Sequence, residues 1–316
     1  MFFNIVIFLV SCFLIIFSSR AIIDALYRLT CRLGWKEFIV AFFAASVGAV
    51  LPELFIGTRA ALAGVPELAL GSIIGQNIIL FTLSIAICTF ILKEIIVESR
   101  TVRAAATFAL VSVILPFILL WDGTLDRADG VLLICACFLY VFWLFSKGDH
   151  FILPKEAQKK TQNPQSSIFK DVAIVFLGFL FVVLSAEGII YAAENISLHL
   201  GISLAFFGLF VISMGVALPE TFFSITLATK GHSWMILGGI LGAISLSSTL
   251  VLGIVSIIHP IEVVDFSSLR VAQFFLISGG FFLLLFVRTS NKITKREAWF
   301  LLGVYLLFLL YEFVIL

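Results

Sequence analysis

Long apolar segments alternate with short polar ones along the entire chain. The apolar windows fall at residues 2–26, 37–63, 68–92, 101–121, 129–146, 170–195, 203–229, 234–258, 268–288 and 297–315. Each window is close to or longer than the roughly 20 residues that an α-helix needs to cross a bilayer. The pattern therefore predicts an all-α integral membrane protein with ten transmembrane helices.

Composition agrees with this prediction. The chain is 62% hydrophobic and 12% charged, whereas soluble domains average roughly 45–50% apolar and 25% charged residues. The net charge is +1 and no basic stripe is present, so nucleic acid is not an expected partner. The five cysteines are scattered through apolar segments without metal-site spacing, and the first window lacks a basic leader, which favours a membrane helix over a signal peptide.

A sequence repeat divides the chain into two halves. Gly48-Ala-Val-Leu-Pro-Glu53 returns as Gly215-Val-Ala-Leu-Pro-Glu220, at an offset of 167 residues. The first half is predicted at 1–146 and the second at 170–316, joined by a polar cytoplasmic linker at 147–169. Because each half holds an odd number of spans, the second enters the membrane from the opposite side, which is the inverted-repeat architecture of many transporters.

The distribution of basic residues predicts the orientation. Sixteen of the 20 Lys and Arg residues lie in or beside the loops that follow the first, third, fifth, seventh and ninth spans. By the positive-inside rule these loops are cytoplasmic. Both termini are therefore expected outside the cytoplasm, in a multi-pass protein of the cell membrane.

One acidic residue lies deep within a span in each half. A carboxylate in the hydrocarbon region costs at least about 2.5–3.5 kcal/mol, so it persists only with a partner or a function. Glu53 lies sixteen residues into its window and Glu220 seventeen. Two such residues at repeat-related positions predict a shared cation site near the middle of the membrane.

A proline precedes each of these acids and predicts a break in the second and seventh helices. Pro52 and Pro219 lack a backbone N–H and clash with the preceding turn. The carbonyl groups near Gly48 and Gly215 should then lose their donors. Free carbonyl oxygens beside a carboxylate suit hard cations such as calcium, magnesium or sodium.

Further polar residues are candidate ligands. Asn77, about 14 Å into its span, is predicted to be an ion ligand, a lock that holds a carboxylate, or a helix–helix hydrogen-bonding residue. Ser46 and Ser213, a repeat pair just before the expected breaks, offer hydroxyl or carbonyl oxygens.

Three other ionisable residues fall within spans. Arg59, six residues after Glu53, is expected to be either an interfacial anchor or an outer-gate charge. Arg20 and Glu187 occupy equivalent positions of the repeat, so inversion places them on opposite faces of the membrane, where they should not pair.

These motifs resemble a known family. The stretches Ser46 to Glu53 and Ser213 to Glu220, each followed some twenty residues later by a Gly-x-x-x-Gly element, are similar to the paired repeats of the cation/calcium exchanger superfamily, closest to its sodium/calcium exchanger branch. The resemblance implies two inverted five-helix halves and alternating access by sliding of the first and sixth helices. It also implies that Glu53 and Glu220 bind the transported ions, that Asn77 matches an amide ligand, and that backbone oxygens around Ser46 and Ser213 match carbonyl ligands.

The chain departs from this family pattern in two places. Ala49-Val50 and Val216-Ala217 stand where hydroxyl residues are usual, and Ile244 stands where an acid or amide is usual. The remaining oxygens could hold one calcium ion, coupled to sodium or to protons.

The leading hypothesis is an antiporter that exchanges calcium, or a related cation, for sodium or protons. Its partners are inorganic cations and membrane lipid, and no cofactor is expected. The alternative is a transport-inactive cation sensor or scaffold on the same fold. An intramembrane enzyme is disfavoured because none of the four histidines lies at mid-depth and no catalytic motif is present.

Overall fold

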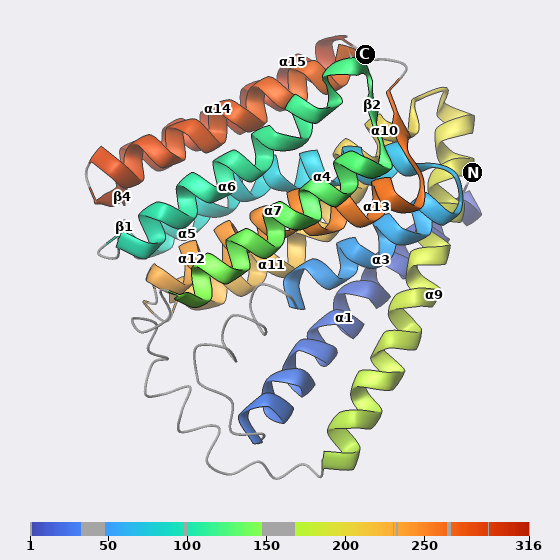
Figure 1. Cartoon of the computed structure of the whole chain (residues 1–316), viewed down its shortest axis with the longest axis horizontal. Helices are drawn as coiled ribbons and strands as arrows, with labels where there is room; N and C mark the ends of the chain where they lie inside the picture. Colours follow the sequence, from blue (N-terminus) through green and yellow to red (C-terminus); the bar gives the residue numbers. More distant parts are fainter. Residues whose placement is uncertain are drawn as a thin grey trace.

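The computed structural model of the chain is a bundle of long helices with two small pairs of strands (Figure 1). It describes residues 2–32, 48–97, 100–146, 168–229, 231, 233–263, 267–289 and 291–315. Of the predicted linker at 147–169, residues 147–167 lie outside the described part of the chain. Apolar segments in lipid become helical because a helix satisfies its own backbone hydrogen bonds.

The elements before the linker are mostly long helices, one of which contains a π-helical turn, η2. They are α1 (Phe2–Arg32), α3 (Gly48–Leu62), α4 (Pro66–Ile79), η2 (Leu80–Ser84), α5 (Ile85–Leu92), β1 (Glu94–Ile96), α6 (Arg100–Leu119), the 3-10 turn η3 (Leu120–Asp122), β2 (Thr124–Leu125) and α7 (Arg127–Ser146).

The elements after the linker follow a closely similar order, with two π-helical turns, η5 and η6. They are α9 (Ile168–Leu200), α10 (Leu204–Phe207), η5 (Gly208–Ile212), α11 (Ser213–Thr229), α12 (Ser233–Leu246), η6 (Ser247–Val251), α13 (Leu252–Ile258), β3 (Ile261–Glu262), α14 (Ser267–Thr289), β4 (Lys292–Thr294) and α15 (Lys295–Ile315).

Seven helical segments in the described residues are long and apolar enough to cross a membrane. They span Pro66–Leu92, Val102–Asp122, Arg127–Leu144, Ile168–Leu200, Leu204–Thr229, Ile236–Ile258 and Leu269–Thr289. The apolar part of α1, Phe3–Ser18, is shorter than these seven. The all-helical membrane architecture is thus confirmed, with seven candidate spans rather than a demonstrated ten.

The structural elements repeat at the offset of the sequence motif. Adding 167 to the bounds of α4 gives those of α12, and the same shift carries η2 onto η6. Side chains follow the same rule, since Thr82 and Thr249 each donate a hydrogen bond to the carbonyl group four residues earlier. A π-helical turn is uncommon and often marks a functional position, so its recurrence in both halves extends the repeat from sequence to backbone geometry.

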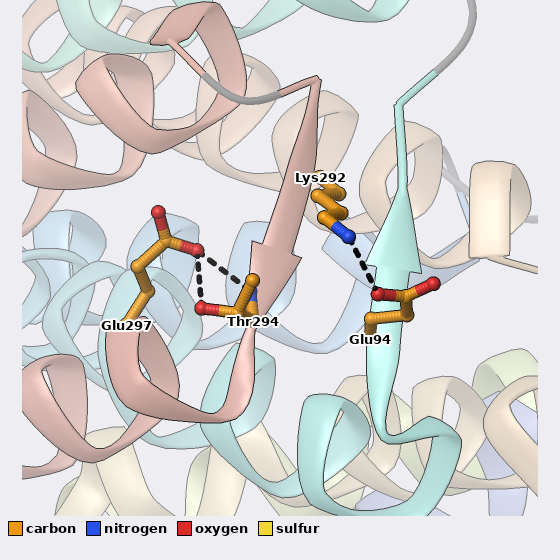
Figure 2. A network of polar contacts seen from close by, with 4 residues as sticks. All are labelled: Glu94, Lys292, Thr294 and Glu297. Atoms are coloured by element: carbon orange, nitrogen blue, oxygen red, sulfur yellow. Dashed lines mark hydrogen bonds and ion pairs between the residues drawn. The ribbon is translucent and has the colours of Figure 1, made fainter.

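Each small sheet takes one strand from each half. β1 pairs antiparallel with β4, and β2 pairs antiparallel with β3. An ion pair between Lys292 and Glu94, 3.1 Å long, reinforces the first sheet, while Glu297 accepts hydrogen bonds from the backbone N–H and the hydroxyl group of Thr294 (Figure 2). The two halves are therefore fastened together at both sheets.

The helices form a buried centre and a less buried periphery, which includes the pair α1 and α9. In the continuous helices Pro66–Leu92 and Ile236–Ile258, 83% of the most apolar window is buried, compared with 33% in α9, 33% in Leu269–Thr289 and 28% in Arg127–Leu144. α9 packs along α1, and in Figure 1 this pair lies on the opposite side of the bundle from α14 and α15. The pair reaches the remaining helices mainly through α3 and α11, the two helices that carry the repeated Leu-Pro-Glu motif.

The prediction that prolines interrupt the second and seventh helices is wrong. α3 continues through Pro52 and α11 through Pro219, although the first half is described only from Gly48 onward. A proline removes a single intrahelical hydrogen bond, and this loss leaves the carbonyl group of residue i−4 without its donor but does not end the helix. The irregularity before α11 is instead the π-helical turn η5, which ends at Ile212.

Candidate functional site

The two repeated glutamates are buried inside the bundle. Glu53 on α3 is 2% exposed and Glu220 on α11 is 4% exposed, so neither faces lipid. Among the residues that the structure describes, both carboxylate oxygens of Glu53, and Oε1 of Glu220, have no hydrogen-bond partner. A buried carboxylate without a partner is strongly unfavourable, so each group requires a cation or a proton that the described part of the chain does not supply.

Glu220 approaches the backbone of a neighbouring helix at a glycine. Gly239 on α12 faces this group, since a Cβ atom placed there would lie 3.3 Å from Oε1. The equivalent residue in the first half is Ser72 on α4, whose buried hydroxyl group has no hydrogen-bond partner. The repeat-related positions therefore differ, with a serine in the first half and a glycine in the second.

Three polar residues of this region were missed in the sequence. Besides Ser72, they are Gln76 on α4, which lies beside the Glu53 carboxyl group, and Ser224 on α11. Gln76 Oε1 and Ser224 Oγ are buried without hydrogen-bond partners. The available signal was their spacing, because Ser72 and Gln76 share one helix face at i, i+4, as do Glu220 and Ser224.

Asn77 links α4 to the π-helical turn of the other half. Its Nδ2 donates to Ser248 Oγ at 2.9 Å, and its Oδ1 accepts from Ser247 Oγ at 3.0 Å. We call these three residues the Asn77 lock. Of the three roles considered for Asn77, these contacts correspond to the helix–helix hydrogen bond. Oδ1 has a second lone pair, which is still able to bind an ion.

A second polar link lies next to Glu220. The Thr221 hydroxyl donates to the Ala217 carbonyl at 2.8 Å, so the Ser84 hydroxyl is the donor in its 2.7 Å contact with Thr221 Oγ1. Ser84 ends η2, the π-helical turn of the first half. The two repeat-related π-helical turns, η2 and η6, therefore each hold a hydrogen bond from one half of the chain to the other.

The other predicted ligands have different positions. Ser213 is buried, and its hydroxyl donates to the carbonyl groups of Leu209 and Phe210 in its own helix. Gly215 lies near Cys12 on α1. Gly48 is the first described residue of α3, and Ser46 lies outside the described residues.

Close packing holds α4 against the segment that leads into α11. A Cβ atom at Gly75 would clash with the Leu209 carbonyl oxygen, and one at Gly208 would clash with the Leu68 carbonyl oxygen. Small residues let helices approach until their backbones touch. This contact fixes Gln76 and Asn77 relative to Ser213 and the start of α11.

Arg59 forms an ion pair with Glu187 of α9. The sequence left Arg59 as an anchor or an outer-gate charge and did not predict this partner. Arg59 lies in the last turn of α3, and Glu187 lies in the second half of α9. The pair joins the helix that carries Glu53 to the peripheral pair of helices.

The arrangement is suited to transient binding of a hard cation. Within the part of the chain that the structure describes, no three His, Cys, Asp or Glu side chains form a ready-made metal site. Two carboxylates, hydroxyl and amide oxygens, and the carbonyl groups freed by Pro52 and Pro219 are all oxygen ligands, which calcium, magnesium and sodium prefer.

Comparison with known proteins agrees with this reading. The family model described as "Sodium/calcium exchanger protein" matches residues 3–146 and 170–314. The inner membrane protein YrbG of Escherichia coli is 27% identical over 297 residues, covering 90% of this chain and 89% of its own. The sodium/calcium exchanger MaX1 of Methanosarcina acetivorans is 21% identical, covering 99% of both chains.

Solved structures show the same fold. The crystal structure of the H+/Ca2+ exchanger CAX superposes with a TM-score of 0.80 at 16% sequence identity, covering 97% of this chain and 82% of that one. At this identity the likeness establishes the architecture and not the transported ion.

Proposed function

The chain belongs to the sodium/calcium exchanger protein family, and we propose that it is a secondary active antiporter that exchanges calcium, or a related cation, for sodium or protons by alternating access. The observation that carries this proposal is the pair of repeat-related glutamates, buried to 2% and 4% exposure with unbonded carboxylate oxygens. In this proposal the two carboxylates, which the repeat relates to each other, bind a cation and release it in exchange for sodium or protons, which is the chemistry of an antiporter.

In this proposal Glu53 and Glu220 hold the transported ion from opposite halves. α3 and α11 contact each other, and both contact α4, which supports a site that both carboxylates share. The freed carbonyl groups of Gly48 and Gly215 add neutral ligands, and oxygens at Ser46 and Ser213 complete the predicted set. Gln76, which lies beside Glu53 and whose Oε1 has no hydrogen-bond partner, joins them as an amide ligand.

Asn77 has a double role in this scheme. Its amide holds η6 in place through the Asn77 lock, and its oxygen remains available to the ion. The second half offers no equivalent amide, because Ile244 occupies the related position. The proposed site is therefore asymmetric, with its amide ligands from the first half alone.

We further propose that ten spans form two inverted five-helix halves, at 1–146 and 170–316. The constant offset of 167 residues between equivalent elements supports this, as does the pairing of strands between halves. The excess of basic residues in alternate loops supports a cytoplasmic linker and extracytoplasmic termini in the cell membrane.

Calcium flux into liposomes tests the function. The full chain is reconstituted, a sodium gradient or a pH gradient is imposed separately, and calcium uptake is measured. Wild-type uptake is expected with at least one gradient, and Glu53→Gln and Glu220→Gln should each abolish it, because each removes half of the charge that neutralises a divalent ion.

A matched control is Glu312→Gln. Glu312 is also a buried glutamate, 3% exposed, but it lies on α15, which packs mainly on α5, η2 and α14. This variant should retain uptake. Normal flux in Glu53→Gln or Glu220→Gln would refute the proposed site, whereas calcium binding without flux under either gradient would favour the sensor or scaffold.

A further inference from the structure

An ion pair connects the peripheral helix α9 to the helix that carries Glu53. Arg59 and Glu187 are in direct contact, with side chains 30% and 58% exposed. Arg59 lies six residues after Glu53 in α3, or about 9 Å of helical rise towards the loop between α3 and α4. We call this end of the bundle the α3–α4 mouth.

The mobile candidate in this contact is α9. It buries much less of its surface than the central helices, and its longest interface is with α1 rather than with the rest of the bundle. The central helices are fastened across the two halves by strand pairs and by the Asn77 lock. A movement that exposes Glu53 at the α3–α4 mouth is therefore most easily made by shifting α9 away from α3.

An aromatic contact also joins these two helices. The rings of Phe55 and Phe179 meet edge to face, with centroids 4.9 Å apart. This contact is apolar and tolerates sliding, whereas an ion pair is made or broken. The Arg59–Glu187 pair is thus a contact of the α3–α9 interface that is either fully formed or fully broken.

Of the two pairs of positions that the repeat relates, only the pair Arg59 and Glu187 combines opposite charges. The residue equivalent to Arg59 is Thr226, whose hydroxyl donates to the Phe222 carbonyl of its own helix at 2.9 Å. The residue equivalent to Glu187 is Arg20. The corresponding positions at the opposite mouth therefore combine a threonine with an arginine and cannot form an ion pair.

We propose that the Arg59–Glu187 ion pair is a one-sided latch, which holds α9 against α3 and keeps the α3–α4 mouth closed. The proposal rests on the proposed antiport function, since it concerns access to the same site. Exposed ion pairs are weak, as a contact that breaks in every transport cycle has to be. The latch biases the distribution between the two access states without preventing the exchange.

Neutralising either partner should make transport asymmetric between the two sides. Arg59→Gln or Glu187→Gln releases the latch and raises the population open at the α3–α4 mouth. The apparent calcium affinity should then increase about 1.5- to 5-fold on that side and decrease by a similar factor on the other, because a shifted equilibrium between two states affects both sides reciprocally. The reversed pair, Arg59→Glu with Glu187→Arg, should restore both affinities to within twofold of wild type.

The measurement uses full-length protein in right-side-out and inside-out vesicles, with calcium uptake followed as a function of calcium concentration. The matched control is Lys292→Gln, which breaks an ion pair of similar exposure between β1 and β4 (47% and 44%; Figure 2). This pair joins two strands that are already hydrogen-bonded to each other and lies outside the α3–α9 interface, so its loss should leave the ratio of the two affinities unchanged.

The outcomes separate the latch from the proposed function. If wild-type protein shows no gradient-driven calcium flux, the antiport proposal fails. If wild type transports, but the single variants leave the ratio of the two affinities unchanged, the latch is refuted and antiport stands. Failure of the reversed pair to restore the ratio would also overturn the latch, because it would show that charge pairing is not the cause.

Discussion

Replacing Asn77 with alanine tests whether a polar lock at η6 joins the two halves of the chain. Asn77 is 1% exposed and makes hydrogen bonds of 2.9 Å and 3.0 Å to Ser248 and Ser247. The two serines respond differently to its loss. Ser247 also contacts the Ile244 carbonyl at 3.1 Å, so its hydroxyl has a second acceptor, whereas Ser248 loses its donor.

The expected magnitude follows from these contacts. Interhelical hydrogen bonds in membrane proteins contribute about 0.6 kcal/mol on average and at most about 1.7. Two lost bonds and a small cavity should lower the free energy of unfolding of Asn77→Ala by about 1–3 kcal/mol. The coupling energy between Asn77→Ala and Ser248→Ala should be about 0.6–1.7 kcal/mol, and the coupling to Ser247→Ala should be smaller.

The assay is a double-mutant cycle on reversible unfolding in mixed micelles. The control is Ser245→Ala, because the Ser245 hydroxyl donates to the Leu241 carbonyl of its own helix at 2.8 Å and should not couple to Asn77. Coupling to Ser248 no larger than coupling to Ser245 would refute the lock. Calcium binding by the same variants addresses the second role: a ligand at Asn77 predicts weaker binding in Asn77→Ala than in Ser248→Ala.

Two further substitutions probe the neutral ligands. Pro219→Ala restores an N–H donor to the Gly215 carbonyl, so unfolding should become less favourable by up to about 3 kcal/mol while calcium affinity falls. The control is Pro116→Ala, also at a proline inside a helix (α6), which should stabilise the protein without changing its calcium affinity. Equal calcium affinity in the two variants would exclude the Gly215 carbonyl as a ligand. Gln76→Met removes a buried amide oxygen that lacks a partner, so stability should be unchanged or higher. Its calcium affinity should fall about tenfold, or about 1.4 kcal/mol, and wild-type affinity in titration calorimetry would contradict the ligand role of Gln76 beside Glu53.

The sequence predicted the helical membrane architecture because hydropathy alone decides which segments lipid accepts. It also predicted the repeat. The offset found in one six-residue motif recurs in the bounds of the folded elements, because α4, η2 and the start of α5 coincide with α12, η6 and the start of α13 when the offset is added. The burial of Glu53 and Glu220 followed from the same argument, because isolated carboxylates do not persist facing hydrocarbon. These conclusions depend on local composition and on spacing, which a single chain displays directly.

The local backbone at the prolines was predicted wrongly. The missing N–H of Pro219 pointed to a broken helix, but α11 continues through it, and the distortion is a π-helical turn that ends at Ile212. One lost hydrogen bond does not outweigh the rest of a helix whose surrounding bundle favours continuity. Propensity at one residue was overridden by packing along the whole segment.

The sequence by itself determined what this protein is made of: apolar helices, a duplicated half, and one acid deep in each copy. The tertiary structure decided which residues meet. Asn77 finds its partners 170 and 171 residues away, and Arg59 finds Glu187 on a helix that sequence reasoning did not connect to it. Such contacts depend on how two halves fold onto each other, and no periodicity within either half encodes the distance between side chains that meet only after both are packed.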